Sequence, residues 1–93
     1  MEDDETYKIL YTSDFEKIIV RLRKRKPDLF VELTSRFGKL TRNPELGKPL
    51  QYGLRNLRRI HVAGSFVLVY EIREFEVVLT DFDHHDKIYE RYA

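Results

Sequence analysis

The hydrophobic spacing changes about halfway along this chain, and that change constrains the fold more than any other feature. Between residues 13 and 43 the apolar residues recur every three or four positions, as in amphipathic helices. From residue 59 onward they alternate with polar residues or form short continuous runs, as in β-strands. A chain of 93 residues forms one domain, so helices and strands must share a single core.

The helical half is expected to form an αα-hairpin. The capping box Ser13–Glu16 predicts a helix start, because the Ser13 hydroxyl can accept a hydrogen bond from the Glu16 amide. Pro27 suits the first turn of a second helix, which Asn43-Pro44 is expected to end. The expected apolar positions are Phe15, Ile18, Ile19 and Leu22, then Phe30, Leu33, Phe37 and Leu40.

The later half is expected to form an antiparallel meander. Its predicted strands are 59–62, 66–72 and 76–82, with turns at 63–65 and 73–75, and Phe66 and Tyr70 are expected in the core. Outside the meander, the sequence predicts an acidic disordered tail at 1–5, a strand at 7–11, a loop at 46–56 and a short helix at 86–92. The fold class is therefore α+β: a four-stranded antiparallel sheet in the order β-α-α-β-β-β, with the helical hairpin on one face and a short helical tail.

Several function classes are excluded by composition. There are no cysteines, so neither disulfides nor thiolate zinc sites can form, which fits a reducing, cytoplasmic environment. The acidic start is unlike a signal peptide, and no apolar run is long enough to span a membrane. Neither a glycine-rich phosphate loop nor a serine in a nucleophile-elbow context is present.

Basic residues are concentrated in the middle of the chain. Residues 17–26 contain six basic side chains and no acidic one, and residues 36–59 contain seven more against Glu45 alone. This pattern indicates an anionic partner, although a solvated helix face rich in Lys and Arg explains residues 17–26 about equally well.

The side chains that can carry acid–base and phosphate chemistry lie in the last third. Arg59 and His61 share one face of a predicted strand, with Ile60 and Val62 facing the helices. Arg59 and His61 are therefore expected on the open face of the sheet. Taken alone, a solvated face is the simpler interpretation of this pair.

His84, His85 and Asp86, preceded by Asp83, superficially resemble a metal site. However, the side chains of neighbouring residues usually diverge, and no histidine pair has helical i, i+4 spacing, so no metal or other cofactor is predicted. An acid–base role for His85 is better motivated, because imidazole exchanges protons near neutral pH.

Three stretches together resemble the RelE/ParE toxin superfamily. They are Leu50-Gln51-Tyr52-Gly53, the run 57–72 that begins Leu-Arg-Arg-Ile-His-Val, and His84-His85-Asp86-Lys87-Ile88-Tyr89; the N-terminal Tyr7–Lys17 also fits. Similarity to the RelE branch implies a ribosome-dependent endoribonuclease that cuts mRNA in the ribosomal A site. In such toxins the messenger's own 2′-hydroxyl attacks the adjacent phosphate, and an acidic cognate antitoxin wraps and inhibits the toxin.

The resemblance also implies roles for individual residues. Arg59 falls at a phosphate-contacting position, His61 where the family often has another basic residue, and Tyr89 at the terminal tyrosine. His85 replaces the arginine of a His-Arg-Asp motif, which makes it a candidate proton donor, and Val67 stands where another arginine is expected. The residues expected to grip ribosomal RNA are Lys17, Arg21, Arg23, Lys24, Arg25, Lys26, Lys48, Arg55 and Arg58.

Two alternatives remain open from the sequence. The chain could be a ParE-like inhibitor that binds DNA gyrase without chemistry of its own, or a catalytically weakened relative that acts only as a binding partner. Val67 is the best support for the second alternative.

Overall fold

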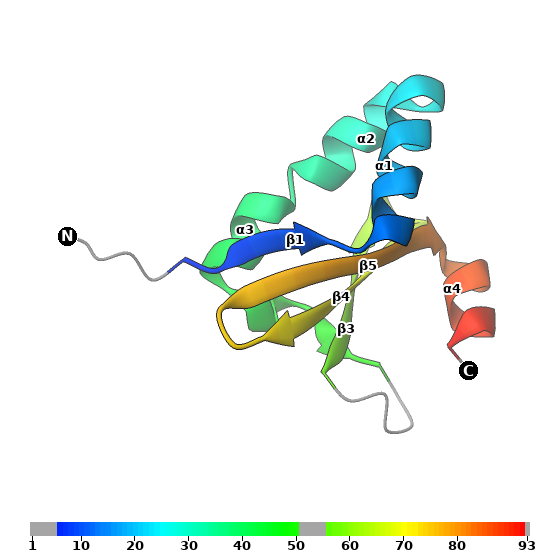
Figure 1. Cartoon of the computed structure of the whole chain (residues 1–93). Coiled ribbons are helices and arrows are strands. Elements are labelled where there is room, and N and C mark those ends of the chain that lie inside the picture. Colours follow the sequence, from blue (N-terminus) through cyan, green and yellow to red (C-terminus); the bar gives the residue numbers. More distant parts are fainter. Residues whose placement is uncertain (1–5, 51–55, 93) are drawn as a thin grey trace.

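The computed structural model describes residues 6–50 and 56–92, which form a mixed sheet covered by helices (Figure 1). The elements in chain order are β1 (Lys8–Tyr11), α1 (Ser13–Arg25), α2 (Pro27–Thr34), α3 (Phe37–Arg42), the 3-10 turn η1 (Pro44–Leu46), β2 (Lys48–Pro49), β3 (Leu57–Val62), β4 (Phe66–Arg73), β5 (Glu76–His84) and α4 (His85–Arg91). In the described ranges, every helix is too short or too polar to cross a lipid bilayer. The predicted acidic tail at residues 1–5 lies outside these ranges.

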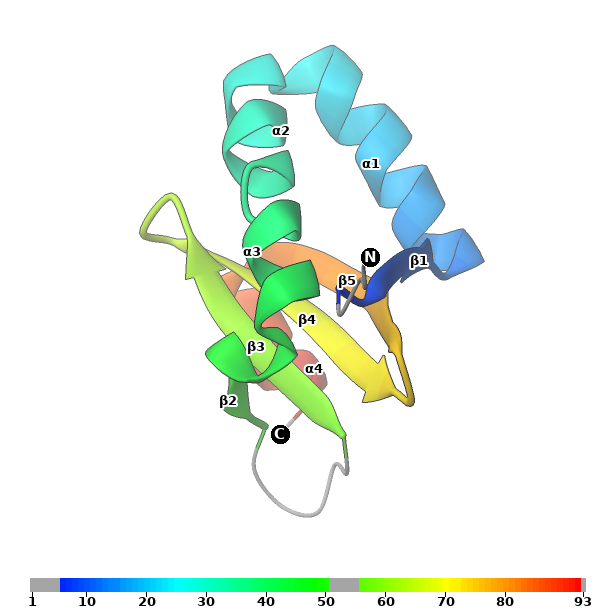
Figure 2. The same ribbon diagram turned by 90° about the vertical axis from the view of Figure 1, so that its left-hand side faces the viewer.

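The meander prediction is confirmed, but the sheet as a whole is not the one predicted. β3, β4 and β5 pair antiparallel in sequence, within a five-stranded sheet of order β1-β5-β4-β3-β2. β1 joins the sheet parallel to β5, so the expectation of four antiparallel strands was wrong. The helices explain the topology: α1 to α3 cross one face and carry the chain from the β1 edge to the opposite edge (Figure 2).

The segment predicted as a loop at 46–56 is partly ordered. η1 and the two-residue strand β2 occupy its first part, and β2 pairs with β3 so that Lys48 lies opposite Arg59. Sequence patterns missed β2 because a strand containing Pro49 at a sheet edge has neither the length nor the alternation of a strand. Residues 51–55, which include Arg55 and most of the Leu50–Gly53 motif, lie outside the described residues.

The helical hairpin is confirmed, with two local corrections. The N-cap of α1 is Thr12 rather than Ser13, and its hydroxyl oxygen accepts a hydrogen bond from the Phe15 amide (3.1 Å). The second predicted helix is broken into α2 and α3. At the break, the hydroxyls of Thr34 and Ser35 donate to the carbonyl oxygens of Phe30 (3.0 Å) and Glu32 (2.6 Å). Local bonds of this kind compete with continuation of a helix.

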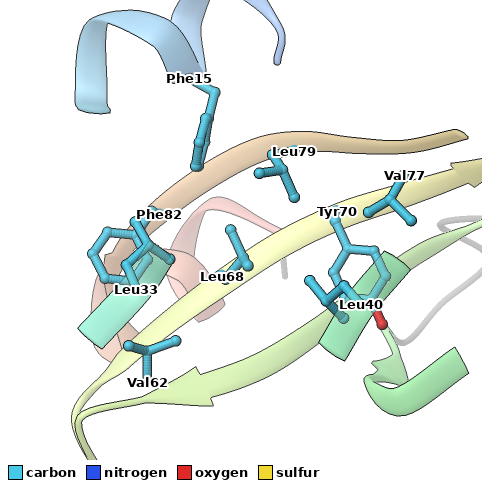
Figure 3. Packing of buried hydrophobic residues seen from close by; sticks show 9 residues of the cluster. All are labelled: Phe15, Leu33, Leu40, Val62, Leu68, Tyr70, Val77, Leu79 and Phe82. Atoms are coloured by element: carbon cyan, nitrogen blue, oxygen red, sulfur yellow. The ribbon is translucent and has the colours of Figure 1, made fainter. Parts of the chain in front are cut away.

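The main core lies between the helices and the sheet (Figure 3). Its buried residues are Phe15, Leu33, Leu40, Val62, Leu68, Tyr70, Val77, Leu79 and Phe82. Phe37 and Phe66 pack against this cluster while partly exposed, as expected for core-facing rings. Phe30 does not belong to it: Leu29 packs there instead, and the Phe30 ring lies 6.0 Å from the Arg23 guanidinium.

The opposite face of the sheet carries a smaller cluster covered by α4. Val67, Val69, Leu50 and Ile88 are buried there, with Tyr92 packed beside them. The expectation that this face is open was therefore wrong, because α4 packs against it, behind β3 and β4 in the view of Figure 2. The predicted helical tail exists, beginning at His85 and ending at Arg91.

Candidate active site

Arg59 lies on the α4 side of the sheet, between two neighbouring strands. It pairs with Val69 of β4 on one side and with Lys48 of β2 on the other. Directly opposite residues of an antiparallel pair point their side chains to the same face. The structure therefore places the exposed Lys48 opposite Arg59 on the same face of the sheet, although the sequence suggested for Lys48 only a general role in RNA binding.

Tyr89 and His85 of α4 extend from Arg59 in a continuous row. The Arg59 guanidinium carbon lies 5.9 Å from the centre of the Tyr89 ring, within the range of cation–π attraction. The Tyr89 and His85 rings are 6.2 Å apart, and the His85 and His84 rings are 4.4 Å apart. Three of the four predicted catalytic residues, Arg59, His85 and Tyr89, are thus neighbours although they lie on different elements.

His61 is the fourth predicted catalytic residue and stands apart from this row. It lies on the same strand face as Arg59, one pleat further along and so about 7 Å away, and its side chain is exposed. In the described residues no hydrogen bond, ion pair or ring contact joins His61 to the others. Its cross-strand neighbour is Val67, which is fully buried under α4.

Contacts of both the backbone and the ring fix the position of His85. Its amide donates to the carbonyl oxygen of Ser65 (2.8 Å), and its Nδ1 lies 2.9 Å from a carboxylate oxygen of Asp86. This leaves Nε2 available to exchange a proton with a bound molecule. The imidazole is more than a third exposed, so a substrate can reach it.

Together with Asp83, three side chains that sequence reasoning did not single out, Arg91, Tyr92 and Asp81, fix α4 against the sheet. Arg91 bonds to the carboxylates of Asp81 and, at 2.7 Å, of Asp83, and the Tyr92 hydroxyl donates to Asp81 (3.1 Å). Burial and the negative charge of Asp81 raise the pKa of Tyr92 to about 12. Burial works against ionisation of Asp83, but hydrogen bonds from Arg91 and the His84 amide lower the pKa of that carboxyl below its usual value. The sequence did contain a signal for these contacts: two acidic residues lie two positions apart on one face of β5, and an arginine follows on the helical tail.

A second group of residues places Lys48 opposite Arg59. The buried Tyr70 hydroxyl donates to the carbonyl oxygen of Pro44 (2.6 Å) and accepts from the Gly47 amide (2.8 Å), while burial raises its pKa. A side chain at Gly47 would come within 2.7 Å of this hydroxyl and of the Arg59 carbonyl oxygen, so only glycine fits there. Arg58, predicted to grip RNA, donates to the Gly47 carbonyl oxygen (2.7 Å) and so helps to hold this turn.

The basic segment 17–26 lies mostly on α1, and its six cationic side chains are exposed. At its end, the Lys26 ammonium lies 5.5 Å from the Phe66 ring, which contacts the His84 ring edge-on (5.8 Å). Arg21, Arg25 and Lys26 also line a groove of about 470 Å³ together with Asp83 and Arg91. The basic segment therefore approaches the end of the row formed by His84, His85, Tyr89 and Arg59.

This fold matches that of small toxins from type II toxin–antitoxin systems. Residues 7–89 match the family model described as ParE toxin of type II toxin-antitoxin system, parDE. The chain belongs to the RelE/ParE toxin superfamily. It is 34% identical over 87 residues to RelE4, a candidate toxin of Methanocaldococcus jannaschii, covering 91% of this chain and 93% of that protein. A Methanosarcina mazei protein is 39% identical over 79 residues, covering 83% of this chain and 87% of its own length.

Solved structures show the same architecture. The Mycobacterium tuberculosis toxin–antitoxin complex RelBE2 contains a chain with a TM-score of 0.72 and 26% identity, covering 85% of this chain and 98% of its own. Escherichia coli RelE, solved in the free state as a mutant with two arginines replaced by alanine, has a TM-score of 0.72 and covers 94% of both chains. At 15% identity the RelE likeness concerns the fold alone.

Proposed function

We propose that this toxin is a ribosome-dependent endoribonuclease that cuts mRNA in the ribosomal A site. The observation that carries this proposal is the row of Arg59, Tyr89 and His85, with Lys48 opposite Arg59 on the neighbouring strand. RNA cleavage requires a cationic side chain that binds the phosphate and groups that transfer protons, and Arg59, Tyr89 and His85 supply a guanidinium, a phenol and an imidazole close together. Inhibition of gyrase by binding needs no such set of groups.

In the proposed reaction the messenger's 2′-hydroxyl oxygen bonds to the adjacent phosphorus while the bond to the 5′-oxygen breaks. A base takes the hydroxyl proton and an acid protonates the leaving oxygen, so the products are a 2′,3′-cyclic phosphate and a 5′-hydroxyl. His85 supplies one of these two proton transfers and His61 the other. Tyr89 orients the 2′-hydroxyl or stacks on a base.

Arg59 and Lys48 stabilise the negative charge that develops on the phosphate. A guanidinium matches two phosphate oxygens at once, and charge stabilisation of this kind is often the largest catalytic contribution. Val67 cannot contribute because it is apolar and fully buried under α4. Lys48, which lies opposite Arg59 on β2, is placed to supply the second cation instead.

The exposed basic side chains of residues 17–26 suggest the binding partners. Lys17, Arg21, Arg23, Lys24, Arg25 and Lys26 are exposed cations that we propose contact ribosomal RNA, and their contribution should fall steeply as salt rises. A cognate antitoxin, acidic to match this surface, is the proposed protein partner. The M. tuberculosis structure is a toxin–antitoxin complex, which supports that pairing.

The test is a cleavage assay with programmed ribosomes, comparing the wild type with Arg59→Ala, Lys48→Ala, His85→Ala and Tyr89→Phe. Arg59→Ala should lower the cleavage rate by roughly 10²–10³-fold, as loss of a charge-stabilising donor does. Arg73→Ala is the matched control, because Arg73 is an exposed arginine at the far end of β4 that forms an ion pair with Glu71. Message that stays intact beside active ribosomes at high toxin dose would sink the proposal, and undiminished cleavage by Arg59→Ala would refute the site.

Inhibition of DNA gyrase is the second candidate function, because the matching family model is described as a ParE toxin. A supercoiling assay with purified gyrase distinguishes the two. Inhibition that survives Arg59→Ala and His85→Ala, without any mRNA cleavage, would favour this candidate over the first.

A further inference from the structure

His84, His85 and Asp86 are brought together in a way that the sequence did not predict. Adjacent residues usually point their side chains apart, yet these two imidazole rings lie 4.4 Å apart at a tilt of 31°. One potential ligand atom from each of the three residues lies within 4.8 Å of the other two. The expectation that these side chains diverge was wrong.

The separations suit a small ion. Two ligands of a tetrahedral ion with bonds of 2.0–2.2 Å are about 3.4 Å apart. The Asp86 carboxylate lies 2.9 Å from His85 Nδ1 and 3.8 Å from His84 Nδ1, on either side of that spacing. Side-chain rotations would have to bring the three ligand atoms, which lie within 4.8 Å of one another, to the spacing around a single ion.

Backbone contacts fix the positions from which these side chains project. The His84 amide donates to the Asp83 carboxylate (2.8 Å), and the His85 amide donates to the Ser65 carbonyl oxygen (2.8 Å). The edge of the His84 ring contacts Phe66. Ion binding through His84 Nδ1 would replace one hydrogen bond, which this atom now accepts from the Asp86 amide (3.2 Å).

The ligand chemistry selects the class of ion. Two imidazoles are nitrogen ligands that suit Zn²⁺ and Cu²⁺, whereas Mg²⁺ and Ca²⁺ prefer several oxygen ligands and this cluster offers one carboxylate. All three side chains are exposed, at 42%, 37% and 77%, so an ion can enter and keep water in its remaining positions.

We propose that His84, His85 and Asp86 form a binding site for a divalent transition-metal ion of the zinc and copper class. Because the site uses His85, a bound ion would occupy the imidazole assigned to proton transfer and inhibit the toxin. The binding itself is independent of the proposed nuclease function, whereas the inhibition rests on it.

Binding is tested by titrating the untagged full-length chain with ZnCl₂ or CuCl₂ in a calorimeter, since a polyhistidine tag would bind the same ions. We expect one ion per chain. His84→Ala, His85→Ala and Asp86→Asn should each weaken binding roughly tenfold or more. His61→Ala is the matched control: it removes the remaining histidine, lies outside the cluster, and should leave binding unchanged.

A second measurement locates the ion without any substitution. Cu²⁺ is paramagnetic, so it should broaden the amide NMR signals of residues around 84–86 first. MgCl₂ should produce neither heat nor broadening. No binding of either transition metal at millimolar concentration would overturn the proposal, and so would binding that survives the double substitution of His84 and His85, or broadening centred elsewhere.

Inhibition is measured separately, as the loss of ribosome-dependent cleavage on adding Zn²⁺ and its recovery with EDTA. If the wild type binds the ion but never cleaves mRNA, the proposed nuclease function fails and the metal site stands. If the wild type cleaves mRNA and does not bind the ion, only the metal site fails.

Discussion

The two faces of the sheet are built on different principles. The face under α1, α2 and α3 buries nine residues in one cluster, and eight of them are purely apolar. The face under α4 buries four residues, and around them stand Arg59, His85 and the carboxylate of Asp81. The first face buries enough apolar surface to stabilise the fold, whereas part of the second face is occupied by polar side chains.

This difference indicates that the main core supplies most of the stability, whereas the face under α4 carries the candidate site. A single short helix is enough to order the polar face, because Arg91 and Tyr92 tie α4 to Asp81 while Ile88 fills the apolar patch. Helix α4 should therefore open independently of the rest, since local units with few buried contacts open at lower cost than the global core. The candidate site would then depend on α4 docking more than on the main core.

The largest expected effect is a loss of global stability from the helix-covered face. Phe15→Ala removes a fully buried ring from the main core and should lower the free energy of unfolding by about 3–5 kcal/mol. Denaturant unfolding monitored by circular dichroism measures this. Phe75→Ala is the control, because its ring is 75% exposed, and it should change stability little. Equal losses for the two variants would mean that α1 does not anchor the core as described.

Val67→Arg tests the other face by introducing the arginine that the family resemblance led us to expect at this position. A guanidinium at this buried position has no room beneath α4, so the substitution should cost about 3 kcal/mol and release the helix. Hydrogen exchange of the α4 amides measures the release directly.

Val20→Arg is the matched control, with the same change at a position that is 54% exposed on α1. It should alter stability by less than ~0.5 kcal/mol. If Val67→Arg left both stability and α4 exchange unchanged, the face would have to be open, as the sequence first suggested.

The helix-covered face was largely predictable from the sequence. Spacing placed Phe15, Leu33 and Leu40 toward the core, and alternation placed Val62 there, because helices and strands each repeat their buried positions at a fixed period. Break points were harder to place, since the hydroxyls of Thr34 and Ser35 interrupt the helix through local bonds that leave the apolar spacing intact.

The candidate site was only partly predictable, because its geometry depends on pairings between distant segments. Alternation placed Arg59 and His61 on one face, and this is where the structure has them. No local pattern could show that α4 returns over that face, that Lys48 lies opposite Arg59, or that Gly47 and Tyr70 hold β2 in place. Those contacts link residues from 11 positions apart (Lys48 and Arg59) to 30 positions apart (Arg59 and Tyr89).

Arg91→Ala should have a smaller effect that is confined to α4. It leaves the nearly buried Asp81 carboxylate with hydrogen bonds from the Tyr92 hydroxyl and the Phe82 amide but without its cationic partner, at a cost of about 2 kcal/mol. Faster exchange of the α4 amides, with little change in the amides of β3 to β5, is the expected result. Arg73→Ala removes an exposed ion pair with Glu71 and serves as the control, with a cost below ~1 kcal/mol. Uniformly faster exchange throughout the sheet would show that the two faces open together.

The smallest expected effect is the pH dependence that Asp83 gives to the docking of α4. Its folded-state pKa is lowered, so the stability that its carboxylate contributes is present above the unfolded value and is lost as pH falls through the folded value. Asp83→Asn keeps the oxygen that accepts from the His84 amide and removes the charge that bonds to Arg91. At neutral pH the wild type should be more stable by ~0.5 kcal/mol, as for an exposed ion pair. Denaturant melts from pH 7 to about 2 should show this difference shrinking to zero as the carboxyl protonates, and shrinking also with added salt. A difference that grows toward acidic pH would contradict the assignment, because it would require Asp83 to destabilise the docked helix.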